Sequence, residues 1–184
     1  MDEVYSVKEA YHLLIEGDEG KEECTWAADV WNSLVPSKMS TIAWRLFHKR
    51  LPTKENLRKR GVPLNSSALC VGGCGNPEME DHLFFNCPTL GAIWRGIARW
   101  LGIPIVFAEG GPDHLLNLKN LVPGNDKIRD RMGVIWFVVV SLIWKVRNEL
   151  IFNHTTLIWK NCWKRAKSFL GESLERVLRG SHMI

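Results

Sequence analysis

The chain has 184 residues, of which 46% are hydrophobic and 24% charged, so we expect one sizeable globular domain or two small ones and not a disordered chain. Its longest nearly unbroken apolar stretch, residues 132–144, has 13 residues, whereas a membrane span needs about 20, so a buried core helix is expected there. The net charge of +4 is segregated, because residues 1–35 carry −7, residues 36–62 carry +7 and residues 126–184 carry +6.

Almost every segment predicts helix. Ser6 and Glu9 form a capping box for a first helix that ends at Gly17. The further helices are expected at residues 26–34, 36–51, 53–61, 79–86, 88–102, 126–152 and 155–178. The class is therefore mainly α.

The third of these helices, PSKMSTIAWRLFHKRL, has two distinct faces at 100° per residue. Its apolar arc consists of Met39, Ile42, Ala43, Trp44, Leu46 and Phe47. Its polar arc consists of Lys38, Thr41, Arg45, His48 and Lys49. We expect the first arc to pack on the core and the second to face solvent.

Residues 103–125 carry Gly110, Gly111, Pro112, Pro123 and Gly124, so they predict a loop or linker with one short turn, apart from a short strand at 105–107. The expected organisation is a helical zinc-binding domain at 1–102 (zinc segment 70–87), this linker, and two C-terminal helices at 126–179 that pack on the domain. The last residues, 180–184, resemble the remnant of an affinity-tag linker.

Three of the five cysteines and one of the six histidines fall in one short stretch, CVGGCGNPEMEDHLFFNC, with the spacing Cys70-x3-Cys74-x7-His82-x4-Cys87. A Cys3His set is a typical closed, structural zinc site, and the glycines beside the first two cysteines let the backbone wrap around a cation. The alternative is a chance cluster of buried cysteines. Because cysteines are scarce here and the spacing is ligand-like, we predict one structural Zn²⁺.

The second half of the zinc segment predicts a helix over residues 79–86 that brings the histidine and the third cysteine to one side. Phe84 and Phe85 would pack beside the site and exclude water, and Glu80 or Asp81 would orient the imidazole. The sequence has no HExxH or deaminase pattern, so no catalytic zinc is expected.

Three stretches, SVKEAYHLL, WNSLVPSKMSTIAWRLFHKRLPTKENLRKRGV and CVGGCGNPEMEDHLFFNCPTLGAIWRGIARWLGI, occur in this order. They resemble the reverse-transcriptase zinc-binding domain of plants, which lies downstream of the polymerase in many LINE-type (non-LTR) retrotransposon proteins. The likeness covers about residues 4–102 well and 130–178 more loosely. It implies that Cys70, Cys74, His82 and Cys87 are the zinc ligands. Here Cys-x3-Cys replaces the commoner Cys-x2-Cys, with a compensating shortening before His82, so Cys74 is the ligand that departs from the family's pattern.

The basic block between residues 36 and 62 predicts a nucleic-acid-binding surface. Its members are Lys38, Arg45, His48, Lys49, Arg50, Lys54, Arg58, Lys59 and Arg60. Phosphates attract such a cluster whatever the base sequence, so RNA and DNA both fit. The alternative is a solvated face paired with the acidic N-terminal residues. Helical periodicity assigns most tryptophans beside basic residues to the core, and not to base stacking.

A second hypothesis is a domesticated, transposon-derived module for protein–protein interaction or regulation. Its contact stripe would be Trp159, Trp163, Ala166 and Leu170 on the last helix. An enzyme is not expected, because no YxDD-like pair and no cluster of carboxylates for two-metal chemistry occurs. Without a signal-like N-terminal segment or a disulfide framework, we expect a reducing, intracellular location, in the nucleus or else the cytoplasm, and no membrane or small-molecule partner.

Overall fold

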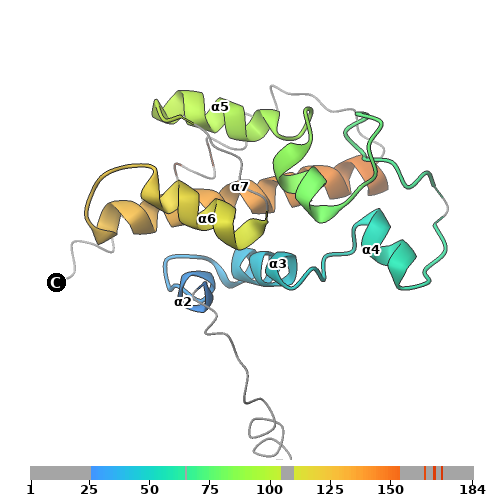
Figure 1. Cartoon of the computed structure of the whole chain (residues 1–184), viewed down its shortest axis with the longest axis horizontal. Coiled ribbons are helices and arrows are strands. Elements are labelled where there is room, and N and C mark those ends of the chain that lie inside the picture. Colours follow the sequence, from blue (N-terminus) through green and yellow to red (C-terminus); the bar gives the residue numbers. More distant parts are fainter. Residues whose placement is uncertain are drawn as a thin grey trace, which may run out of the picture.

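The computed structural model describes residues 26–64, 66–104 and 110–153, and the single positions 164, 168 and 171. In this part of the chain the elements are helices, without a strand (Figure 1). They are α2 (Ala27–Val30), α3 (Ser37–Phe47), α4 (Lys54–Lys59), the π-helix η1 (His82–Asn86), α5 (Ala92–Leu101), α6 (Gly111–Asn120) and α7 (Asp126–Phe152). The predicted mainly α class is confirmed. The elements expected at residues 6–17 and 105–107, and most of that at 155–178, lie outside the described residues.

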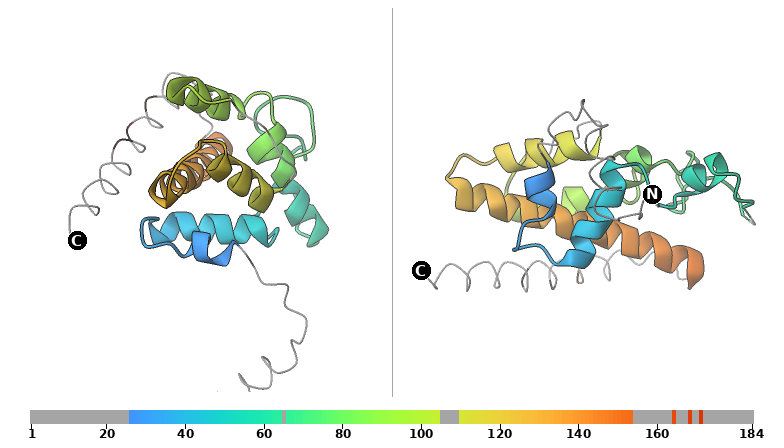
Figure 2. Two further views of the ribbon diagram at one scale, coloured as in Figure 1. Left: turned by 60° about the vertical axis from the view of Figure 1, so that its left-hand side comes forward. Right: turned by 90° about the horizontal axis from the view of Figure 1, so that it is seen from below.

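Helix α7 is the centre of the fold. Figures 1 and 2 show it running between α3 on one side and α5 on the other, with α6 alongside. All nine residues from Met132 to Val140 are buried, because neighbouring helices cover this part of α7 on every side. This agrees with the expected buried helix, and no described helix is long and apolar enough to span a membrane.

Helix α3 has the two faces that its sequence predicts. Ser40, Ala43 and Leu46 are buried, whereas the basic residues of the opposite face are exposed. The helix ends at Phe47, earlier than expected, because Lys49 adopts a left-handed backbone with φ of 51°. The Arg50 N–H donates a hydrogen bond to the Arg45 carbonyl at 2.7 Å, and the Lys49 N–H donates to the Leu46 carbonyl at 3.0 Å. Together these two bonds form a Schellman motif.

Helix α4 begins and ends near the predicted residues, whereas α5 ends near its predicted end but begins at Ala92, four residues after the predicted start at 88. The Thr53 side chain caps α4 by accepting from the Asn56 N–H at 3.3 Å, and Gly61, with φ of 74°, follows the helix. Gly102, with φ of 69°, ends α5 in the left-handed conformation that favours glycine. By contrast, α2 spans only Ala27–Val30, which is shorter than the predicted 26–34.

The prediction of a loop or linker at residues 103–125 is wrong for its middle part, because residues 111–120 form α6. Gly110 and Pro112 read as loop signals in the sequence, but proline at the first helical turn is compatible with a helix start. The helix buries His114, Leu115 and Leu118 against the core. A Cβ on Gly111 would lie 2.8 Å from the Phe47 ring, so this glycine permits close packing of α6 on α3.

Candidate metal centre

The first two cysteines lie on a narrow loop that is closed by an isolated bridge between Leu69 and Pro77. The Cys70 N–H donates to the Asn76 carbonyl at 2.7 Å across this bridge. Gly73 and Gly75 have φ of 70° and 80°, a conformation that costs other residues about 1–2 kcal/mol. The glycines therefore let the backbone turn back within a few residues and present both thiols to the same side.

The other two ligands come from η1 and its C-terminal end. A helix was predicted here, but an α-helix would turn by about 140° over the five residues from His82 to Cys87 and separate their side chains. The observed π-helix has i→i+5 hydrogen bonds and therefore more residues per turn than an α-helix, so position 87, its extended C-cap, lies closer to the side of position 82. The unusual helix type is thus what brings the imidazole and the third thiol together.

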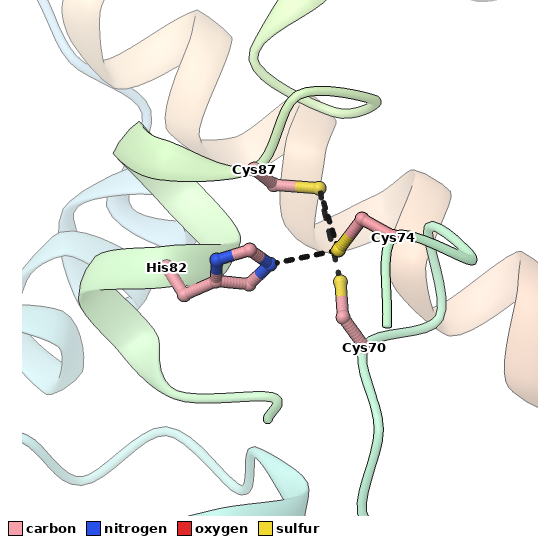
Figure 3. Close-up of side chains that lie close together, drawn as sticks. All are labelled: Cys70, Cys74, His82 and Cys87. Carbon is pink, nitrogen blue, oxygen red and sulfur yellow. Dashed lines mark hydrogen bonds between the residues drawn. The ribbon is translucent and has the colours of Figure 1, made fainter. Parts of the chain in front are cut away.

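Figure 3 shows the four side chains converging on one point. Cys87 Sγ lies 3.8 Å from both Cys70 Sγ and Cys74 Sγ, and Cys74 Sγ lies 3.1 Å from His82 Nε2. All four ligand atoms lie within 4.8 Å of one another. Zinc–sulfur bonds of about 2.3 Å in a tetrahedron place two sulfurs about 3.8 Å apart, whereas a disulfide needs about 2.05 Å. The group can therefore hold one zinc ion.

The charge on the thiols also favours a cation. Backbone N–H groups of Gly72 and Leu90 donate to the sulfurs of Cys70 and Cys87, each at 3.4 Å. The hydrogen bond between the two thiols, more than any other contact, lowers the pKa of Cys87 to about 4 and raises that of Cys70, with burial adding to the rise. Neighbouring thiols compete for one negative charge in this way, and a bound zinc ion would stabilise all of them as thiolates.

The space around the ligands is closely filled. A Cβ on Gly72 would lie 3.1 Å from Cys87 Sγ and 3.2 Å from Thr89 Cβ, so a side chain at that position would press on a ligand. Phe84 and Phe85, 0% and 2% exposed, are buried in the core, where their rings lie against those of Trp144 and His114 respectively. Four protein ligands complete a tetrahedron, which is typical of a structural site and leaves no coordination position for a substrate.

A buried ion pair anchors the metal loop to the central helix. Arg147 of α7 donates to Glu78 Oε1 from Nη2 at 2.7 Å and from Nε at 3.1 Å, and both side chains are almost fully buried. Arg147 Nη2 also donates to the Pro52 carbonyl at 3.1 Å, and Glu78 Oε1 accepts from the Lys54 N–H at 3.1 Å. Sequence reasoning missed this pair, because its members are 69 residues apart and no local pattern connects them.

Glu80, considered above as a partner of the imidazole, is engaged elsewhere. Its Oε1 accepts from the Leu51 N–H at 3.0 Å and from Asn56 Nδ2 at 2.9 Å. Burial raises the pKa of Glu80 to about 7, against the effect of the bond from Leu51. Its carboxyl group thus joins the end of the α3–α4 connection to the zinc segment.

The predicted nucleic-acid-binding residues lie over α3, α4 and the turn between them. Eight of the nine are exposed, and Lys54 is half-buried with its Nζ 2.8 Å from the Leu69 carbonyl. Arg58 forms two hydrogen bonds with the carboxylate of Glu55, at 2.8 and 2.9 Å, and Lys59 lies 3.9 Å from it. Among the described residues no carboxylate pairs with Lys38, Arg45, Lys49, Arg50 or Arg60.

Comparison with known families agrees with this geometry. Residues 5–94 match the family model described as "zinc-binding in reverse transcriptase", and this range includes all four converging ligands. No curated protein and no solved structure matches the chain. Residues 5–94, just under half of the chain, are therefore similar to the zinc-binding domain of reverse transcriptases.

Proposed function

We propose that this protein is a zinc-stabilised nucleic-acid-binding module, related to the C-terminal region of plant LINE-type reverse transcriptases and without polymerase or nuclease activity of its own. The observation that carries the proposal is that α4, which bears part of the basic surface, is hydrogen-bonded to residues on both sides of the metal loop. No residue of α4 is fully buried, and residues 54–57 are half-buried, so packing on the core contributes only part of what holds this helix. It is also held by hydrogen bonds to the loop that presents the cysteines.

These bonds join the first turn of α4 to the segments on either side of the cysteine loop. The Lys54 N–H donates to the Glu78 carboxylate at 3.1 Å, the Glu55 N–H to the Glu78 carbonyl at 3.3 Å, and Lys54 Nζ to the Leu69 carbonyl at 2.8 Å. Structural zinc binding and folding of the surrounding loop are linked. A zinc ion at the site would therefore orient α4 and the basic residues at its end relative to those on α3.

The chemistry of this surface suits phosphate. Guanidinium groups grip phosphate oxygens in a bidentate geometry, and exposed cations without a carboxylate partner lose little on binding. Arg45, Lys49, Arg50 and Arg60 meet that condition within the described residues, whereas Glu55 already partly neutralises the adjacent Arg58. Such contacts do not select a base sequence, so RNA and DNA are both expected ligands.

The salt dependence of binding tests this proposal. Fluorescence anisotropy with labelled RNA, single-stranded DNA and duplex DNA should show affinity that falls steeply between about 50 and 200 mM salt. In the test variant, glutamine replaces Arg45, Lys49, Arg50 and Arg60. This variant should bind more weakly, and its log–log salt slope should be smaller by about 0.9 per lost contact on duplex DNA and about 0.7 on single strands.

A control with the same change in net charge separates local contacts from overall charge. It replaces four exposed basic residues elsewhere on the surface, Arg95, Arg99, Lys127 and Arg129, by glutamine. If both variants bind equally well, or if the parent protein binds no nucleic acid at any salt concentration, the proposal is wrong. In that case the protein-interaction module gains support. The stripe at residues 159–170 on which that alternative depends lies outside the described residues, apart from Lys164 and Ser168.

A further inference from the structure

A hollow of about 650 Å³ lies where the end of α3 meets the end of α4. It is lined by Trp44, Arg45, Arg50, Pro52 and Arg60, so three guanidinium groups and one indole surround it and no carboxylate contributes. This is a more specific arrangement than a basic face. It places an aromatic side chain next to three arginines.

Trp44 lies between the core and this hollow. It is half-buried and packs against the core, and its ring lies 4.9 Å from that of His48. The guanidinium of Arg50 lies over the ring, 5.6 Å from its centroid. Most tryptophans beside basic residues were expected in the core, but Trp44 lies on the border between the core and this hollow.

The Schellman motif after α3 positions Arg50 beside Trp44. Because Lys49 takes a left-handed backbone, the chain reverses and returns Arg50 to the side of Trp44. A lysine in this conformation is less stable than glycine, and such strain is often found at functional sites. Arg60, the C-cap of α4, reaches the same hollow from the other side.

We propose that this hollow holds one nucleotide of a single-stranded nucleic acid. Arg45 and Arg60 would bind its phosphate, Arg50 would turn from the ring of Trp44 to the same phosphate, and the base would take its place against that ring. Only an unpaired base can be turned out to stack on a side chain, and such stacking tolerates any base. This inference depends on the proposed nucleic-acid-binding function and adds a preference for single strands over duplex.

The test compares ligands that differ only in their bases. A single-stranded oligothymidylate and an abasic oligonucleotide of the same length carry the same phosphates. The parent protein should bind the oligothymidylate about tenfold more tightly, because stacking of one base contributes about this factor. Trp44→Leu should abolish the difference by weakening only the oligothymidylate complex, and Trp44→Phe should retain most of it.

Trp100→Leu is the matched control, because Trp100 is also partly exposed but lies on α5. It should leave both affinities unchanged. Zinc content and circular dichroism establish that each variant is folded, and the parent's comparison of the two oligonucleotides needs no variant at all. Equal affinity of the parent for both ligands would overturn this inference and leave the proposed function standing. If Trp44→Leu still prefers the oligothymidylate, this inference is also wrong and the proposed function stands. If the parent binds neither ligand, the proposed function itself is wrong.

Discussion

Substituting Arg147 by methionine should lower the free energy of unfolding by about 3–5 kcal/mol, the range typical of breaking a buried ion pair at one partner. Methionine keeps the apolar stem of the side chain, so the loss comes from charge and hydrogen bonding. Glu78, which is 0% exposed, would lose both bonds from Arg147 and keep on its side chain only the donor from Lys54. Its Oε2 has no hydrogen-bond partner among the described residues even in the parent. Protonating a glutamate of ordinary pKa at pH 7 costs about 3.7 kcal/mol, and this value lies within the range expected for the loss of stability.

Urea unfolding of the zinc-loaded protein, followed by circular dichroism, measures this loss. The double variant Glu78→Gln, Arg147→Met should recover much of it, because two neutral side chains of similar volume leave no unpaired buried charge. Arg129→Met is the control on the same helix, where the arginine is half-exposed and faces the exposed Asp126 at 3.7 Å, so its effect should stay within about 0.5 kcal/mol. The reasoning is refuted if Arg147→Met costs no more than this control, or if the double variant is as unstable as the single one.

Three further predictions concern the metal, pH and the turn after α3. Changing Cys70 and Cys74 together to serine should reduce bound zinc from about one ion per chain to none by metal analysis; full retention would refute the ligand assignment. Burial lowers the pKa of His114 to about 4 from its usual 6.5, so the folded state keeps the imidazole neutral and its stability should fall as the pH drops below about 6.5. At pH 5 the free energy of unfolding should be lower by about 2 kcal/mol from this cause. His114→Gln retains an acceptor for Trp136 and should lack this loss when unfolding is compared between pH 7 and pH 5. A variant with the same pH dependence as the parent would contradict the prediction. Lys49→Gly should raise the unfolding free energy by up to about 1 kcal/mol, because it relieves the left-handed backbone, while removing one charge from the nucleic-acid-binding surface; destabilisation would show that the lysine is not strained.

Local features of the sequence were sufficient to predict the amphipathic helices and the candidate ligands. Helix α3 follows from the alternation of Ala43 and Leu46 with basic residues, and α7 from a long apolar run. Cys70, Cys74, His82 and Cys87 lie in eighteen residues, so their spacing alone limits how far apart they can be. These predictions succeeded because the interactions they require lie within a few residues of one another along the chain.

Only the tertiary structure decided where these parts lie relative to one another. Residues 111–120 begin with a Gly-Pro pair that is typical of a loop, yet they form α6 because α3 and α7 offer an apolar surface on which to bury it. The π-helical turn before Cys87 is not encoded by any periodicity that sequence reasoning uses. Likewise, the bond between Glu78 and Arg147 and the hollow beside Trp44 join segments that are distant in the sequence or separated by a reversal of the chain. Packing, which depends on all neighbours at once, overrides local propensity at these positions.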